Sequence, residues 1–291
     1  MSASEIETIL DTAASFKNSK TSKALAGRTV AFLFSEASTR TRSSFEVAAR
    51  RLSAEVLGFS IASSSLLKGK SLLDTIKNLE VMGVEYFIVR HEVSGVLEPL
   101  KDLTAASLIN AGDGAHEHPT QALLDLFTLR EKKGALKNLR VVIVGDILHS
   151  RVARSNIHGL KKLGAKVTVC GPRALIPPGI ESLGAAVSHD LDRALAGADA
   201  VNVLRLQLER QKQNLVTSVS DYYRSFGLTA ERLAKFPDCL VLHPGPMNRG
   251  VEISSAAADG PQAVILEQVA NGVLVRMSVL SLIEKWRSRG R

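Results

Sequence analysis

The chain has 291 residues, which is long enough for two domains. Charged residues make up 23% of it and hydrophobic residues 45%, and this balance excludes a disordered or fibrous protein. The formal net charge of +8 suits acidic partners, but aromatic residues are only 4% and the basic residues are spread along the chain. Small anionic substrates are therefore favoured, and nucleic acid is not expected as a partner.

No sequence signal points to a membrane or to secretion. Uncharged apolar runs all stay shorter than the about 18 residues that a membrane span needs. Residues 1–5 lack the basic and apolar regions of a signal peptide, so we expect a cytosolic, cytoplasmic location and no membrane partner. Cys170 and Cys239 lie in apolar runs and are expected to be buried free thiols rather than a disulfide or a zinc site.

The first half of the chain predicts alternating helices and strands. Residues 4–17 carry a one-sided apolar stripe, which is typical of an amphipathic helix, and residues 29–34 form a β-branched and aromatic run typical of a buried strand. Apolar residues then return at helical spacing up to Leu52. The further elements expected in this half are a strand at 55–59, a helix at 72–82, strands at 85–91 and 106–111, and a helix at 119–133.

The turn between the first strand and its helix, residues 38–42, has the composition of an anion-binding site. A helix start directs backbone N–H groups and the positive end of the helix dipole at one point. Hydroxyl groups at Ser38, Thr39 and Thr41 and guanidinium groups at Arg40 and Arg42 add further donors. A plain helix cap followed by solvated arginines is the alternative, but this density of donors favours phosphate binding.

Two other segments of the first half resemble well-known sites without matching them. Residues 69–71 read Gly-Lys-Ser like the end of a P-loop, yet Ser64 stands where that motif needs glycine, so ATP binding is rejected. Residues 116–118 read His-Glu-His, but no third metal ligand is evident, so a hydrogen-bonding role is favoured for His118 and no metal is expected.

The second half, beyond a connector at residues 132–137, predicts a doubly wound parallel sheet. Its first strand-to-helix turn lacks the Gly-x-Gly-x-x-Gly pattern, so no dinucleotide is implied, and Arg151 at the helix start is placed to meet a carboxylate. An X–Pro bond in the turn at 243–250 is a candidate for the cis form. The expected elements are strands at 139–146, 166–170, 187–188, 198–206 and 240–242, and helices at 152–163, 191–196 and 261–286.

Several motifs, taken together and in this order, resemble the catalytic chains of the aspartate carbamoyltransferase family. The resemblance covers nearly the whole chain. The motifs are Ser38-Thr39-Arg40-Thr41-Arg42, Lys68-Gly69, Arg90-His91, His118-Pro119-Thr120-Gln121, Gly145-Asp146 with Ser150-Arg151, Arg205-x-Gln207-x-Glu209-Arg210, and His243-Pro244-Gly245-Pro246.

The resemblance implies an α/β fold of two domains, each a mainly parallel sheet flanked by helices, with the C-terminal helix packing back on the first domain. Residues 1–134 with the helix at about 275–291 would bind carbamoyl phosphate, and residues 135–274 would bind L-aspartate. It implies transfer of the carbamoyl group to aspartate in pyrimidine biosynthesis, no cofactor, and a homotrimer with shared active sites. A regulatory chain or a dihydroorotase is a possible further partner.

The family's site residues carry over onto matching positions of this sequence. By this resemblance Thr41, Arg90, His118 and Lys68 are catalytic. Carbamoyl phosphate would be bound by Ser38, Thr39, Arg40, Thr41, Arg90, His118, Gln121 and Ser64. The neighbouring subunit would supply Ser64 and Lys68. Aspartate would be bound by Lys68, Arg151, Arg205, Gln207, Gly245 and Pro246.

Two alternatives and one departure from the family pattern accompany this interpretation. One alternative is a carbamoyltransferase for another amine such as ornithine, although that group has His-Cys-Leu-Pro where this chain has His243-Pro244-Gly245-Pro246. The other is a non-catalytic homologue that acts as a scaffold for dihydroorotase. The departure is Lys70, which replaces the family's usual Glu; we hypothesise that it loosens the Lys68 loop and raises the Michaelis constant for aspartate.

Overall fold

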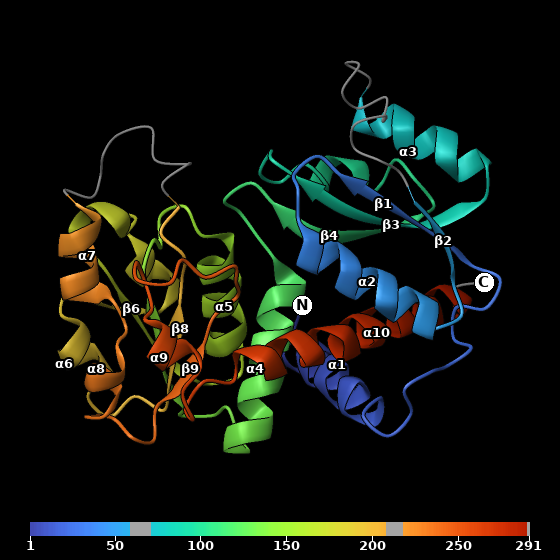
Figure 1. The fold of residues 1–291 in the computed structure, drawn as a ribbon. Helices are drawn as coiled ribbons and strands as arrows, with labels where there is room; N and C mark the ends of the chain where they lie inside the picture. Colours follow the sequence, from blue (N-terminus) through green and yellow to red (C-terminus); the bar gives the residue numbers. More distant parts are fainter. Residues whose placement is uncertain (59–70, 208–217, 290–291) are drawn as a thin grey trace. The chain divides into compact units, whose positions relative to one another are not determined.

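The computed structural model describes residues 1–58, 71–207 and 218–289, and it divides into two compact α/β units (Figure 1). Unit 1 comprises Ala3–Leu123 with Val269–Arg291, and unit 2 comprises Leu124–Gln268. The division falls inside two helices, α4 (Pro119–Lys133) and α10 (Ile265–Arg289).

Unit 1 is built on a four-stranded parallel sheet in the order β2-β1-β3-β4. Helices follow the strands along the chain, as predicted for an α/β unit. The elements are α1 (Ala3–Ser15), β1 (Thr29–Phe34), α2 (Thr39–Arg51), β2 (Glu55–Leu57), α3 (Leu72–Val81), β3 (Val84–His91), a 3₁₀ turn η3 (Glu98–Leu100) and β4 (Ser107–Asp113).

Both faces of the unit 1 sheet are buried, which explains why β1 reads as a continuous apolar run. Alternate residues of a strand point to opposite faces. Phe32 joins a cluster with Phe45 of α2 and Met277 of α10, and Leu33 joins a second cluster with Ile76 of α3. The sheet is therefore covered on one side by α2 and α10 and on the other by α3 (Figure 1).

The C-terminal helix packs on unit 1, as expected. Ser278 donates to the Ile9 carbonyl oxygen at 2.7 Å, and Glu284 forms an ion pair with Arg28 at 2.7 Å. Within the described ranges α10 is the one helix long and apolar enough to cross a membrane, with a mean hydropathy of 1.3 over 18 residues, but 61% of that window is buried inside the protein. Its apolar composition fits a core helix.

Unit 2 contains a five-stranded parallel sheet in the order β7-β6-β5-β8-β9, which confirms the doubly wound arrangement. Its strands are β5 (Arg140–Val144), β6 (Lys166–Cys170), β7 (Ala186–Ser188), β8 (Ala200–Val203) and β9 (Leu240–Leu242). Its helices are α5 (Arg151–Lys162), α6 (Leu191–Leu195), α7 (Val219–Phe226), α8 (Ala230–Leu233) and α9 (Ser255–Ala258), with 3₁₀ turns η4 (Arg173–Leu175) and η5 (Ile180–Leu183).

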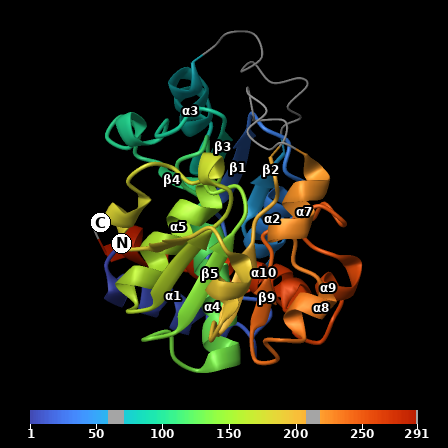
Figure 2. The same cartoon turned by 90° about the vertical axis from the view of Figure 1, so that its left-hand side faces the viewer.

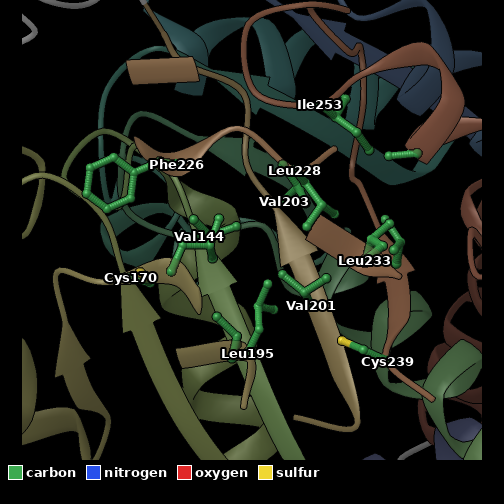
Figure 3. Close-up of a cluster of buried hydrophobic side chains, with 14 of the residues drawn as sticks. Val144, Cys170, Leu195, Val201, Val203, Phe226, Leu228, Leu233, Cys239 and Ile253 are labelled. Atoms are coloured by element: carbon green, nitrogen blue, oxygen red, sulfur yellow. The ribbon is translucent and has the colours of Figure 1, made fainter. Parts of the chain in front are cut away.

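The unit 2 core includes both cysteines, and Figure 3 shows Cys239 on the side of Val201 and Leu233 and Cys170 on the side of Val144. Cys170 and Cys239 are free and buried, as predicted. Burial raises the pKa of each thiol to about 12, so neither is a thiolate at neutral pH.

The predictions missed three short helices and extended several strands too far; the strand expected at 55–59 is limited to Glu55–Leu57 and the one expected at 139–146 to Arg140–Val144. Helices α7, α8 and α9 were not predicted because each is too short for a clear apolar period; α8 and α9 lie side by side (Figure 2). Their N-cap side chains, Ser218, Thr229 and Ser254, do accept hydrogen bonds from the first helical turn. The strand expected at 198–206 is limited to Ala200–Val203.

Candidate functional site

The carboxyl ends of β1, β3 and β4 lie next to one another at one edge of the unit 1 sheet. Phe34 is paired with Arg90, and His91 is paired with Asp113. In parallel sheets this edge is where ligands bind. The segments that follow these strands contain the phosphate turn, the end of β3 with Arg90, and the start of α4 with His118.

The turn that opens α2 differs from most other helix starts in this protein. Ser38 occupies the N-cap position with φ −158° and ψ 85°, but its side chain makes no capping hydrogen bond. In α3, α5, α6, α7, α8 and α9 the N-cap side chain accepts a bond from a backbone N–H. The first-turn N–H groups of α2 are therefore not capped by Ser38, which suits an external anion.

The predicted phosphate ligands are distributed around this turn. Thr41 is buried with 8% of its surface exposed, Ser38 and Arg42 are half-buried, and Thr39 and Arg40 are exposed. The structure thus combines backbone donors, hydroxyl groups and guanidinium groups within one helical turn. This combination can neutralise and orient a phosphate dianion.

Arg90 connects the turn after β1 with the end of β4. Its Nε lies 3.3 Å from Oε2 of Glu36, and its Nη1 donates to the Ala111 carbonyl oxygen at 3.4 Å. The Ser35 N–H donates to the Arg90 carbonyl oxygen at 3.0 Å. The guanidinium is therefore held at the same sheet edge as the α2 turn.

His118 and Gln121 lie at the start of α4, and both are almost fully buried. The His118 carbonyl oxygen accepts hydrogen bonds from the N–H groups of Gln121 and Ala122 at 3.0 and 3.2 Å. The neighbouring His116 is directed elsewhere, because its Nδ1 lies 3.0 Å from Oδ2 of Asp113. Among the residues described by the structure there is no group of His, Cys, Asp and Glu side chains that could hold a metal ion.

In unit 2 the carboxyl ends of β5, β8 and β9 are neighbours, and each leads into a predicted aspartate-binding segment. Gly145 follows β5 with φ +130°, and a Cβ there would lie 2.6 Å from the Leu204 carbonyl oxygen. The Leu204 N–H donates to Val144 at 2.8 Å. Only glycine permits this close approach, which brings the two strand ends together.

Asp146 connects the turn before α5 to the segment after β8. Its buried carboxylate accepts from the His149 N–H at 3.2 Å and from the Gln207 N–H at 3.3 Å, and it lies 2.8 Å from His149 Nδ1. The Gln207 amide donates to the His149 carbonyl oxygen at 3.1 Å. Arg151, at 5% exposure, is the first residue of α5, and Arg205 is half-buried just before Gln207. The structure thus gathers these predicted residues at one sheet edge of unit 2.

The turn after β9 contains a cis bond between Gly245 and Pro246, and His243 holds it. The Gly245 N–H donates to His243 Nδ1 at 2.8 Å. This bond makes Nδ1 an acceptor and places the ring proton on Nε2, which lies 3.2 Å from Oε1 of the buried Glu252. Glu252 also accepts from the Asn248 N–H at 2.5 Å, so it closes the turn.

A buried hydrogen-bond network centred on Asp125 and Gln268 holds the backbone of this turn at His243, and the sequence did not predict it. The His243 N–H donates to Gln268 at 2.9 Å, and Gln268 donates to Asp125 at 2.8 Å. Asp125 also accepts from the amides of Asn156 at 2.8 Å and Asn202 at 3.1 Å. The available signal was a lone carboxylate within the apolar stretch of α4, since such a group needs buried donors.

The remaining predictions concern residues outside the described ranges. Ser64, Lys68 and Lys70 fall in 59–70, and Glu209 and Arg210 fall in 208–217.

The sequence matches two domain models of one family. The model described as the carbamoyl-P binding domain of aspartate/ornithine carbamoyltransferase matches residues 1–131. The model described as the Asp/Orn binding domain matches residues 137–283.

Curated relatives and solved structures agree with this match. The chain is 56% identical to the aspartate carbamoyltransferase catalytic subunit of Syntrophotalea carbinolica, over 97% of this chain and 92% of the relative. It is 55% identical to that of Halothermothrix orenii, with the same coverage.

Among solved structures, the Trypanosoma cruzi aspartate transcarbamoylase complex with N-(phosphonacetyl)-L-aspartic acid is similar with a TM-score of 0.88 and 29% identity, covering 97% of this chain and 92% of that one. The ornithine carbamoyltransferase of Pyrococcus furiosus is similar with a TM-score of 0.87 and 30% identity, covering 97% and 94%. On these grounds the chain belongs to the aspartate/ornithine carbamoyltransferase family.

Proposed function

We propose that this chain is a carbamoyltransferase that transfers the carbamoyl group of carbamoyl phosphate to the amine of L-aspartate, giving N-carbamoyl-L-aspartate and phosphate. The observation that carries this proposal is the α2 turn, where the Ser38 side chain makes no capping bond to the first helical turn and lies beside further hydroxyl and guanidinium donors. Relatives at 55% and 56% identity that bear the name aspartate carbamoyltransferase catalytic subunit support the choice of amine.

The fold alone does not choose between aspartate and ornithine, because solved structures of both enzymes are similar at TM-scores of 0.88 and 0.87. The residues favour aspartate. Arg151 and Arg205 carry positive charge, which complements a dicarboxylate and would repel the second ammonium group of ornithine. A non-catalytic scaffold is disfavoured because the anion-binding turn and Arg90, His118 and Gln121 are all present in unit 1.

The chemistry requires donors at the carbonyl oxygen of carbamoyl phosphate. The aspartate amine attacks the carbonyl carbon, a C–N bond forms, and negative charge develops on the carbonyl oxygen. The C–O bond to phosphate then breaks, and the leaving phosphate takes the proton released by the amine. We assign Thr41, Arg90 and His118 to the developing oxyanion, with Gln121 holding the carbamoyl nitrogen.

Binding both substrates in fixed positions supplies the rest of the acceleration. In this proposal Ser38, Thr39 and Arg40 hold the phosphate. Arg151, Arg205 and Gln207 hold the aspartate carboxylates, and the Gly245–Pro246 turn positions the attacking amine. Residues 1–134 with 275–291 serve carbamoyl phosphate, and residues 135–274 serve aspartate.

Assembly and cellular role extend the same proposal. We assign the active form to a homotrimer in which Ser64 and Lys68 complete the neighbouring subunit's site. The reaction would serve pyrimidine biosynthesis in the cytoplasm, and a regulatory chain or dihydroorotase is a candidate partner. Light scattering of the purified chain at three times its mass of 31.2 kDa would support the trimer, and a monomer would contradict it.

The direct test measures product formed by the purified chain from carbamoyl phosphate with L-aspartate or L-ornithine. Carbamoyl-aspartate from aspartate alone is the expected result. Inhibition by N-(phosphonacetyl)-L-aspartate, which joins both halves of the reaction in one molecule, should accompany it. Product from ornithine would overturn the assignment of the unit 2 arginines, and no product from either amine would contradict the proposed activity.

A further inference from the structure

Asp113, the last residue of β4, carries a carboxylate that is only 2% exposed at the substrate edge of unit 1. Its Oδ1 accepts from the Asn110 amide at 2.8 Å and from the Glu117 N–H at 3.0 Å. Its Oδ2 accepts from the Gly95 N–H at 2.5 Å and lies 3.0 Å from His116 Nδ1. A buried carboxylate persists only with such donors, so this one is built into the site.

Both oxygens of Asp113 contact the segment that follows β4, and Oδ2 also contacts the segment that follows β3. The partners of Oδ1 belong to β4 and to the β4 loop, which we define as residues 114–118. Gly95, a partner of Oδ2, belongs to the β3 loop, which we define as residues 92–95. The two loops are joined again where the Ala115 N–H donates to Ser94 Oγ at 3.3 Å. Asp113 is therefore the charged centre of a junction between the two loops.

Each loop adjoins a residue with a proposed role at the carbamoyl group. Arg90 lies near the end of β3 just before the β3 loop, and His118 ends the β4 loop. The register between β3 and β4 shifts by one residue between the pairs Val89–Asn110 and His91–Asp113. Such an irregularity re-aims side chains next to active sites, and Arg90 donates to Ala111 within it.

We propose that Asp113 is a positioning residue: its carboxylate ties the β3 loop to the β4 loop and thereby sets the separation of the Arg90 guanidinium from His118. This inference rests on the proposed function, in which the Arg90 guanidinium and His118 stabilise the carbamoyl oxygen. The negative charge is maintained at neutral pH. Burial raises the pKa of Asp113, but hydrogen bonds from Asn110, His116 and Gly95 lower the pKa by more than burial raises it. The pKa therefore lies below its ordinary value of 3.8.

Asp113→Asn tests the junction with little change of volume. With the amide NH₂ in the Oδ2 position it faces the Gly95 N–H, and the bond to the β3 loop is lost. With the NH₂ in the Oδ1 position it faces the Asn110 amide and the Glu117 N–H, and the bonds to β4 and the β4 loop are lost. Either orientation therefore weakens the junction. Two ligands distinguish binding at the α2 turn from binding by Arg90 and His118. Inorganic phosphate needs only the α2 turn, whereas phosphonoacetamide, which carries a carbamoyl-like group on a phosphonate, also needs Arg90 and His118.

We expect Asp113→Asn to weaken phosphonoacetamide binding about 10- to 100-fold and to leave phosphate binding within about twofold, with kcat reduced about 100-fold. Calorimetric titration gives both affinities. Glu80→Ala is the matched control, because Glu80 accepts N–H bonds from Ala105 and Ala106 near the opposite end of β4, at 2.7 and 3.1 Å. It should lower stability without changing the ratio of the two affinities.

A second variant covers the case in which Asp113→Asn does not fold. Ser94→Ala removes one bond of the same junction at an exposed position and should lower phosphonoacetamide affinity about threefold, in line with one lost hydrogen bond. If the wild-type chain forms carbamoyl-aspartate but the variants keep the wild-type ratio of affinities, the role of Asp113 is refuted and the proposed function stands. If the wild-type chain forms no product, the proposed function fails and this inference fails with it.

Discussion

The helices that follow β1 in unit 1 and β5 in unit 2 both have serine at the N-cap position and use it differently. In unit 2, Ser150 follows β5 and its hydroxyl accepts from the Ala153 N–H at 3.2 Å, so α5 is capped by its own chain. In unit 1, Ser38 follows β1 and makes no such bond. Both helices follow a strand and begin after a serine, but only the Ser150 side chain accepts a bond from its own helix.

This difference suggests how each half of the reaction is bound. A capped helix start offers its side chains, and in α5 the first of these is Arg151, whose guanidinium matches a carboxylate. An uncapped start offers its backbone N–H groups, which match the three oxygens of a phosphate. On this account unit 2 recognises aspartate chiefly through side chains, and unit 1 recognises phosphate chiefly through backbone and hydroxyl groups.

The largest expected effect comes from removing Arg151, the side chain that we assign to an aspartate carboxylate. Arg151→Ala should lower kcat/KM for aspartate about 100- to 1,000-fold, because losing a charge-assisted, two-point contact costs about 3–4 kcal/mol. Steady-state kinetics would measure it, with Lys161→Ala as the control for an exposed charge on the same helix. A loss below about tenfold would mean that Arg151 does not bind substrate.

A smaller loss should follow from disturbing the backbone of the same turn. Gly145→Ala places a Cβ against the Leu204 carbonyl oxygen at a φ of +130°, and should cost about 2–3 kcal/mol of unfolding free energy. The Michaelis constant for aspartate should rise as well, since Leu204 precedes Arg205. Gly179→Ala is the control, because Gly179 has φ +75° but a Cβ there would meet nothing within 4 Å. It measures the cost of the positive φ alone. An equal loss of unfolding free energy in both variants would show that the contact with Leu204 contributes nothing.

The unit 1 junction predicts a dependence on pH. Because the pKa of Asp113 is lowered on folding, its stabilisation is present above the ordinary value of 3.8 and is lost as pH falls through the folded value. The groups that face it are Asn110, His116 and the N–H groups of Gly95 and Glu117. Denaturant titrations of the wild type and Asp113→Asn should therefore differ at neutral pH, and the difference should shrink as pH falls from about 4 through the folded pKa. A difference independent of pH would show that the charge itself contributes nothing.

Long periodic elements of the fold followed from the sequence alone. The bounds of β1, α4 and β6 match the predictions because their apolar patterns and end signals are strong. The short helices α7–α9 were missed because a single turn or two gives no period.

The candidate site was predictable in its residues and not in its connections. The helix start after β5 indicated Arg151 and the family resemblance indicated Arg90, but the bond from Gly95 to Asp113 joins the β3 loop to the end of β4, which no local pattern shows. Nor does the sequence distinguish Ser38 from Ser150, since both stand at an N-cap position and only the structure reveals which hydroxyl caps its helix.

The most direct test of the contrast compares Ser38→Ala with Ser150→Ala, each measured for unfolding free energy and for affinity toward inorganic phosphate. Ser150→Ala should lose about 1 kcal/mol of stability and bind phosphate normally. Ser38→Ala should keep its stability within a few tenths of a kcal/mol and bind phosphate about 5- to 10-fold more weakly. If Ser38→Ala is instead destabilised like Ser150→Ala and binds phosphate as the wild type does, the α2 turn is an ordinary helix start and the assignment of phosphate to it is wrong.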